Sequence, residues 1–171
     1  GFNRVFDTSF TADLTVIEES NEFIKRIQKN EFIPQFTSCC PAWVKFVEQY
    51  YPEFVHNLSS CRSPQQMFGA LSKEILAAQT GKKREDIVVV SIMPCTAKKF
   101  EAKRPEFIHD GVRDVDHVIT TQELGRMIEE AGLNFKELDP ESFNLPFGFK
   151  TGAGVIFGNS GGVSEAVLRY V

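Results

Sequence analysis

An apolar, β-branched run at Ile87-Val88-Val89-Val90 constrains the fold of this chain more than any other segment. β-branched side chains favour extended backbone, and a continuous apolar run of this length is typical of a strand buried on both faces. We therefore expect a strand within 84–93, which would place Pro94 and Cys95 at its carboxyl end. Such strands occur in parallel sheets, whose neighbouring strands need crossover helices.

The order strand then helix is repeated further along the chain. Val115–Ile119 predicts a second strand, and Thr120-Thr121-Gln122-Glu123 has the pattern of a capping box that starts a helix. Apolar residues at helical spacing predict another helix over 13–30, and Pro41 and Pro64 are each suited to the first turn of a helix. These units predict an α/β fold with a mainly parallel sheet flanked by helices.

The remaining segments predict irregular structure. Residues 134–150 contain prolines and a glycine typical of loop, and the glycine-rich stretch 151–158 leads towards a last helix. The length of 171 residues is sufficient for one domain with a core. Because the chain starts Gly1-Phe2-Asn3-Arg4, as if cut from a longer protein, we expect residues 1–171 to be a single, incomplete domain.

Composition argues against several classes of function. The formal net charge is −4 and no long basic stretch is present, which does not favour a nucleic-acid-binding surface. The longest apolar runs are far shorter than the roughly 18 to 20 residues that a membrane-spanning helix needs. We therefore expect neither nucleic acid nor a membrane span among the partners.

Four cysteines carry the clearest chemical signal: Cys39, Cys40, Cys61 and Cys95. Neither a signal peptide nor a disulfide-rich composition is present, and the spacing lacks the paired knuckles of a zinc site, so reduced thiols are expected. Adjacent side chains in extended backbone point to opposite sides, which suggests different tasks for Cys39 and Cys40.

Cys40 precedes a helix N-terminus, where free N–H groups favour anionic sulfur, and Cys95 lies at the strand edge where α/β sheets assemble their sites. These two cysteines could meet, whereas Cys61 is expected to be a small apolar core residue. A 4Fe-4S cluster normally takes four thiolates, so a cluster would need ligands that this sequence lacks.

Two longer motifs resemble a known family. Residues 37–43, Thr-Ser-Cys-Cys-Pro-Ala-Trp, and residues 93–101, Met-Pro-Cys-Thr-Ala-Lys-Lys-Phe-Glu, are similar to the first two cluster-binding signatures of iron-iron hydrogenases. Residues 13–15, 18–19, 58–60, 63–66, 114–116 and 152–162 resemble the same catalytic domain. The third signature, with two further cysteines, is absent, and so are the ferredoxin-like modules of many relatives. The chain thus resembles the middle of that domain.

The resemblance implies reversible reduction of protons to H2 at an H-cluster, a 4Fe-4S cubane bridged to a two-iron subsite with CO, cyanide and azadithiolate. It implies that Cys40 and Cys95 are metal ligands and that Cys39 passes protons to the subsite. The residues that it implies around the cofactor are Lys98, which would donate to a cyanide, Met93, Gln65, Phe157 and Gly158, which would allow close backbone approach.

The resemblance also implies a proton route. Glu19 and Glu22 are three residues apart and share a helix face, which Arg26 continues. Together with Ser59 they match the positions that carry protons towards Cys39 in relatives. On an arbitrary helix such a cluster is an exposed salt-bridged face. A relay needs groups that exchange protons near neutral pH, and burial raises carboxyl pKa values towards that range.

The hydrogenase interpretation predicts ferredoxin or a similar electron carrier and hydrogenase maturation proteins as partners, with H2 and protons as substrates. It predicts a cytoplasmic location, or a periplasmic one as in some relatives, and an isolated piece that is inactive. The alternative is a non-catalytic iron-sulfur relative, either a sensor-type homologue or an iron-sulfur assembly factor. Assembly factors are not expected to keep Cys39, Lys98 and both glutamates together.

Overall fold

The computed structural model describes residues 1–171, which form two compact units. The first unit contains Gly1–Met67 and Phe143–Val171, and the second contains Phe68–Ser142. Helix α3 (Pro64–Thr80) begins in the first unit and continues in the second. The first unit is therefore built from the two ends of the chain, and the expected single domain over 1–171 stays a prediction.

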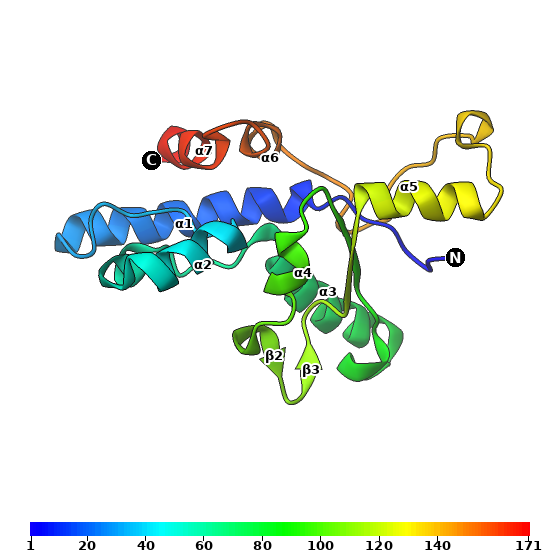
Figure 1. Cartoon of the computed structure of the whole chain (residues 1–171), viewed down its shortest axis with the longest axis horizontal. Helices are drawn as coiled ribbons and strands as arrows, with labels where there is room; N and C mark the ends of the chain where they lie inside the picture. The colour runs from blue at the N-terminus through cyan, green and yellow to red at the C-terminus, as the bar shows by residue number, and fades with distance from the viewer. The chain divides into compact units, whose positions relative to one another are not determined.

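Helix α1 (Ser9–Lys29) is the longest element, and α6 (Gly152–Phe157) and α7 (Gly162–Tyr170) pack along it (Figure 1). The helix predicted over 13–30 is confirmed, with an earlier start. Its buried face is formed by small and polar residues: Thr11, Ala12, Thr15, Val16, Glu19 and Ser20. The apolar residues that suggested the helix are less buried, and Ile27 is 48% exposed. Small side chains let the neighbouring helices approach closely.

Helix α6 forms in the glycine-rich stretch, where the sequence pattern predicts no helix. Asp13 of α1 accepts hydrogen bonds from the Thr151 N–H at 2.6 Å, the Thr151 hydroxyl at 2.7 Å and the Gly154 N–H at 2.6 Å. A Cβ at Gly154 would lie 2.8 Å from the Ser9 carbonyl oxygen, so this close packing requires glycine. A carboxylate at the helix N-terminus satisfies free N–H groups, which explains why α6 is helical.

Helix α2 (Pro41–Tyr50) starts at proline as predicted, and the 3-10 turn η1 (Pro52–Asn57) follows it. The chain then returns to pair Leu58 with Phe36 in an isolated parallel bridge, and the Ser59 N–H donates to the Phe36 carbonyl at 2.7 Å. This pairing ties residues 58–61 to the segment that precedes the two adjacent cysteines.

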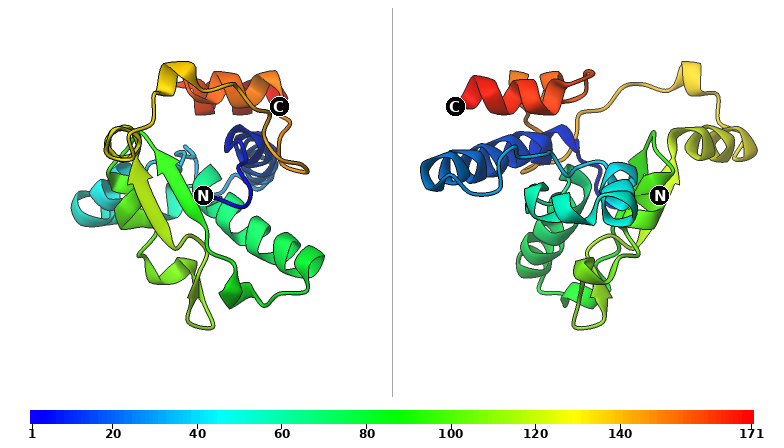
Figure 2. Two further views of the ribbon diagram at one scale, coloured as in Figure 1. Left: turned by 90° about the vertical axis from the view of Figure 1, so that its right-hand side faces the viewer. Right: turned by 60° about the vertical axis from the view of Figure 1, so that its left-hand side comes forward.

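The second unit contains the predicted parallel strands. Strand β1 (Val90–Met93) pairs in parallel with β4 (His117–Thr120), as the two neighbouring arrows in Figure 2 show. The strand predicted within 84–93 is confirmed only over Val90–Met93, because Arg84–Asp86 forms the 3-10 turn η2 and residues 87–89 lie outside the strand. The expected burial on both faces is wrong, since Val88 is 65% exposed and Ile92 is 40% exposed. Val89, Ala102 and Val115 form the buried apolar cluster beside this pair. The parallel sheet flanked by helices is confirmed, although it has only two strands.

Short elements complete the second unit. They are α4 (Ala97–Glu101), η3 (Pro105–Phe107), the antiparallel pair β2 (Ile108–His109) and β3 (Val112–Arg113), α5 (Thr121–Glu130) and η4 (Phe135–Glu137). The predicted capping box is confirmed, because Thr120 Oγ1 accepts from the Glu123 N–H and Glu123 accepts from the Thr120 N–H. None of the helices in the chain combines the length and the apolar character needed to cross a membrane.

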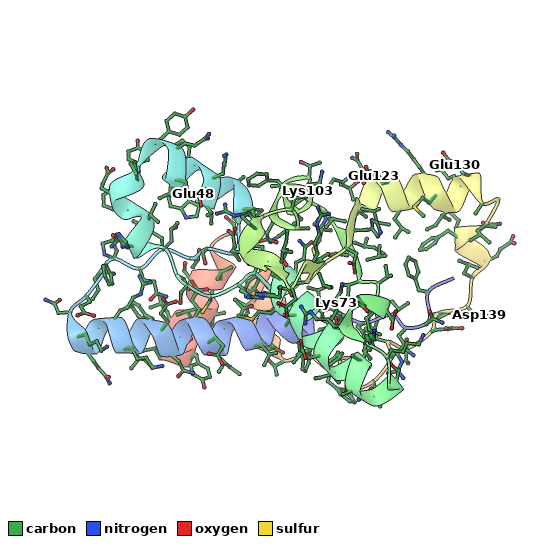
Figure 3. The ribbon with its side chains drawn as sticks, turned by 90° about the horizontal axis from the view of Figure 1, so that it is seen from below. Glu48, Lys73, Lys103, Glu123, Glu130 and Asp139 are labelled. Atoms are coloured by element: carbon green, nitrogen blue, oxygen red, sulfur yellow. The ribbon has the colours of Figure 1, made fainter.

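A buried ion pair lies within the second unit. Lys73, on α3 in Figure 3, is completely buried, and its Nζ lies 2.8 Å from Asp116 Oδ2 and 2.9 Å from Oδ1. The Val89 N–H donates to the same carboxylate at 2.7 Å. The pair links α3 to the segment that enters β4, and both charges have partners.

Candidate functional site

The residues expected to carry chemistry fall into two sets. Nine lie in the first unit: Glu19, Glu22, Arg26, Cys39, Cys40, Ser59, Gln65, Phe157 and Gly158. Met93, Cys95 and Lys98 lie in the second unit. In the first unit, Glu19, Glu22, Arg26 and Ser59 come together, and we call these four residues the carboxylate cluster.

Glu19 is the buried member of the carboxylate cluster. It is 1% exposed, and its Oε1 atom has no hydrogen-bond partner. Burial, assisted by the nearby negative charge of Glu22, raises the pKa of Glu19 from 4.5 to about 7. This side chain can therefore gain and lose a proton close to neutral pH.

Glu22, one turn further along α1, is surrounded by donors. Its Oε2 accepts from the Ser59 hydroxyl at 2.6 Å, its Oε1 accepts from Arg26 Nη2 at 2.7 Å, and the Ser60 N–H lies 3.1 Å from both oxygens. Burial acts to raise the pKa of Glu22, but the hydrogen bonds from Ser59, Ser60 and Arg26 outweigh it and lower that pKa. The two glutamates thus differ in proton affinity.

Ser59 connects the two carboxylates. Its hydroxyl accepts from the Cys61 N–H at 3.1 Å and donates to Glu22 Oε2 at 2.6 Å, and its presence near Glu19 acts to lower the pKa of that carboxyl. A hydroxyl both donates and accepts, so it can pass a proton between two neighbouring groups. The predicted association of Ser59 with both glutamates is present in the structure.

Arg26 holds the outer end of the carboxylate cluster. Besides Glu22 it donates to the carbonyl oxygens of Phe32, His56, Asn57 and Leu58, at 2.8 to 3.3 Å. A guanidinium has five N–H donors in a fixed plane, which suits this many acceptors. Arg26 therefore fixes the loop that carries Ser59 as well as the charge of Glu22.

The cysteines of the first unit have different surroundings. All are free thiols; Cys40 is exposed as the N-cap of α2, while Cys39 and Cys61 are partly buried. Cys61 is not the apolar core residue expected, because its Sγ lies 3.7 Å from Glu22 Oε2. Burial, together with the nearby carboxylates, raises the pKa of the Cys61 thiol to about 12, so it stays protonated at neutral pH.

In the second unit, β1 ends at Met93, so Cys95 follows the carboxyl end of the strand as predicted. Helix α4 begins two residues later. The Cys95 carbonyl accepts from the Lys98 N–H at 3.3 Å, which closes the turn. Lys98 Nζ lies 3.1 and 3.2 Å from the two Glu101 oxygens, and both side chains are largely buried. Glu101 thus fixes the position of the Lys98 ammonium, a role that the sequence pattern alone did not assign.

Gln65 and Gln66 begin α3 and are both buried. Neither the nitrogen nor the oxygen of the Gln66 amide has a hydrogen-bond partner. Buried amides are almost always paired, so the Gln66 side chain is an exception to this rule. At the end of α6, Phe157 is partly buried, and a Cβ at Gly158 would meet only the Val155 carbonyl oxygen at 3.6 Å. Close approach at Gly158 stays a prediction.

No group of three His, Cys, Asp or Glu side chains converges as a metal site. The thiol donors Cys40 and Cys95 nevertheless have the chemistry of iron-sulfur ligands, and each lies beside a helix start. Two thiols are half of the four thiolates that a 4Fe-4S cluster normally takes.

Sequence reasoning missed three contributors to these surroundings. Asp13 caps α6, Cys61 contacts Glu22, and the Ser60 N–H donates to the same carboxylate. Cys61 and Ser60 act through the return of the chain at Leu58, a long-range contact that no local pattern reveals. Asp13 contacts residues far along the chain, and the resemblance of residues 13–15 to the family gave it no specific role.

Comparison with known proteins gives consistent matches over the whole chain. The family described as iron only hydrogenase large subunit, C-terminal domain, matches residues 1–171. Iron hydrogenase 1 of Clostridium pasteurianum is 49% identical over 169 residues, covering 99% of this chain and 29% of that protein. A structure of apo FeFe-hydrogenase HydA1 from Chlamydomonas reinhardtii superimposes with a TM-score of 0.86 at 47% identity, covering 99% of this chain and 43% of that one.

A second group of relatives is similar at lower identity. The cytosolic Fe-S cluster assembly factor narfl of Xenopus tropicalis is 37% identical over 180 residues, covering 99% of this chain and 38% of that protein. The chain thus spans less than half the length of the relatives it matches.

Proposed function

Since this chain belongs to the family of C-terminal domains of iron-only hydrogenase large subunits, we propose that it forms part of the catalytic domain of an enzyme that reduces protons reversibly to H2. The observation that carries the proposal is the carboxylate cluster. The pKa of Glu19 is raised to about 7, whereas the pKa of Glu22 is lowered. Ser59 lies between these two carboxyls and donates to Glu22. An assembly factor has no need of such a proton-exchanging set.

The cofactor assigned to this domain is the H-cluster, whose two-iron subsite carries CO, cyanide and azadithiolate. When bound, it supplies the iron at which protons and electrons combine. Cys40 and Cys95 would provide two thiolates for its cubane, and two more would come from sequence outside these 171 residues. Lys98, held by Glu101, would donate a hydrogen bond to a cyanide. Met93, Gln65, Phe157 and Gly158 would line the subsite.

The chain's own residues move protons in this scheme. Glu22 takes up a proton at Oε2, the oxygen that the Ser59 hydroxyl contacts, and the hydroxyl receives this proton while giving its own to Glu19. The unpartnered Oε1 of Glu19 exchanges protons with the Cys39 thiol, directly or through water. Arg26 holds Glu22 next to Ser59 during these transfers, because it donates both to Glu22 and to the carbonyl oxygen of Leu58.

Electrons would come from ferredoxin or a similar carrier, and hydrogenase maturation proteins would install the cofactor. One relative, from Nitratidesulfovibrio vulgaris, is named a periplasmic hydrogenase large subunit. For this chain we assign the cytoplasm, where its free thiols would be kept reduced.

The test uses the protein expressed from its complete gene together with maturation proteins. Hydrogen evolution from reduced methyl viologen is expected, and Cys39→Ala should abolish it. A wild type no more active than Cys39→Ala would overturn the enzyme assignment and favour the assembly-factor alternative.

The carboxylate cluster is tested by Glu22→Gln in the same protein. Turnover is expected to fall roughly 100-fold or more, the size of a lost acid-base contribution, while the infrared bands of CO and cyanide remain. Glu18→Gln, an exposed neighbour on α1, should change neither. Loss of the bands would show that Glu22 is structural, and unchanged turnover would remove it from the proton route.

A further inference from the structure

Cys61 contacts Glu22 beside Ser59, at a position where the resemblance assigned no role. Its Sγ lies 3.7 Å from Glu22 Oε2, the same oxygen that the Ser59 hydroxyl contacts at 2.6 Å. The Cys61 N–H donates to Ser59 Oγ at 3.1 Å, so the hydroxyl proton is directed to Glu22. The Cys61 carbonyl accepts from the Ser38 hydroxyl at 2.9 Å, which joins this residue to the neighbour of Cys39.

Every group in contact with the Glu22 carboxylate is a donor. Hydrogen bonds from Ser59, Ser60 and Arg26 lower the pKa of Glu22, and the Cys61 thiol contacts Oε2 as a fourth donor. Glu19 is the other charged group that acts on Cys61. To accept a proton at Oε2, Glu22 must lose one of these donors. The Arg26 guanidinium is held by four carbonyl oxygens, and the Ser60 N–H belongs to the backbone and cannot rotate, which leaves the hydroxyl and the thiol.

A thiol is the weakest donor in this set. The S–H···O contact is also the longest of those made to Glu22. The thiol can turn away from Oε2 at the smallest loss of hydrogen bonding, whereas loss of the Ser59 contact would interrupt the link to Glu19. Because the Cys61 thiol stays protonated at neutral pH, it acts as a neutral donor and does not compete with Glu22 for the proton.

We propose that Cys61 is a positioning residue whose thiol is the donor that yields when Glu22 takes up a proton. This inference rests on the proposed function, because it gives Cys61 a task only if Glu22 carries protons. The role sets how readily Glu22 is protonated and leaves the reacting atoms untouched.

Two variants of the mature full-length protein test the proposal through the pH dependence of hydrogen evolution. In Cys61→Ser a stronger O–H donor holds Glu22 ionised, so the fall of turnover on the alkaline side of the pH profile should move to lower pH. Turnover at pH 7 should then fall roughly two- to fivefold. In Cys61→Ala the donor is missing, so the fall on the alkaline side should move to higher pH. Opposite shifts support the proposal; shifts in the same direction, or none, overturn it.

A second readout needs no cofactor. The infrared S–H stretching band of Cys61 is obtained from full-length apoprotein by subtracting the spectrum of Cys61→Ala. Glu22→Gln should shift this band towards that of a free thiol, because an amide oxygen accepts more weakly than a carboxylate. A band that does not move would mean that the thiol does not donate to Glu22, and the proposal would fail.

The same experiments separate this inference from the proposed function. If Glu22→Gln removes turnover but the two Cys61 variants do not diverge, the proton route stands and only the role of Cys61 is rejected. If Glu22→Gln retains turnover, the route itself is wrong and the role of Cys61 falls with it.

Discussion

The carboxylate cluster of the first unit and the Lys73–Asp116 pair of the second both bury charged side chains, but they leave them in opposite states. Lys73 and Asp116 neutralise each other at 2.8 Å, and the Val89 N–H completes the carboxylate. Glu19 has an oxygen without a partner, and its pKa is about 7. Complete pairing fixes a charge and holds elements together, whereas an incomplete set leaves a group able to exchange a proton.

The largest expected effect is on the free energy of unfolding, when the Lys73–Asp116 pair is broken. Lys73→Met would leave Asp116 without its counter-charge, and loss of one partner of a buried ion pair costs roughly 3–5 kcal/mol. Denaturant unfolding of the full-length apoprotein should report this loss. Lys103→Met, at an exposed lysine, is the matched control and should change the free energy of unfolding by less than about 0.5 kcal/mol. A similar small change for Lys73→Met would show that the pair is not structural.

The next effect is on the pH dependence of stability, and it concerns Glu19, whose carboxyl has an oxygen without a partner. Because the pKa of Glu19 is raised from 4.5 to about 7, the folded protein binds more protons than the unfolded chain between these values. The stability contribution of Glu19 is therefore greatest below pH 4.5 and decreases as the pH rises to about 7, by about 3 kcal/mol at most.

Glu19→Gln removes this titration. The free energy of unfolding of the variant should therefore decrease less between pH 4.5 and 7 than that of the wild type. Unfolding of the apoprotein across this range measures it, with Glu18→Gln, at an exposed glutamate, as the control that keeps the wild-type slope. If Glu19→Gln and wild type have the same slope, Glu19 is not the group with the raised pKa.

The smallest effect concerns the capping box of α5, where the glutamate Glu123 is paired but lies at the surface. Glu123 is paired with Lys99 and with the Thr120 N–H, which lower its pKa to about 2, yet it lies at the surface. Thr120→Ala removes the capping hydroxyl of α5 and should cost about 1 kcal/mol in unfolding free energy. Thr121→Ala, at the exposed next position, should cost less. Equal losses would mean that the capping box does not stabilise this helix.

Much of the fold could be predicted because its signals are local. The capping box at Thr120 and the prolines at 41 and 64 each determine structure through their immediate neighbours, and these three predictions agree with the elements found. The β-branched run located a strand only approximately, because Val90 alone of its four residues lies in β1. The buried face of α1 could not be predicted in the same way. It depends on α6 and α7, which come from the other end of the chain and favour small residues over large apolar ones.

The candidate site likewise contains some contacts that sequence patterns predict and others that depend on tertiary structure. The pairing of Glu19 with Glu22 follows from helical spacing, and their association with Ser59 was expected from the resemblance. The contact of Cys61 depends on the bridge between Phe36 and Leu58, and the cap on α6 depends on Asp13 meeting Thr151. Both are tertiary contacts between segments that carry no shared motif.

The discontinuous first unit has a consequence for biosynthesis. Helix α1 emerges from the ribosome early, but α6 and α7, which cover its polar face, follow only after all of Phe68–Ser142 has been made. Until then Ser20 lacks the Val167 carbonyl that its hydroxyl contacts in the folded chain. The buried face of α1 is therefore completed late, when the C-terminal helices dock onto it.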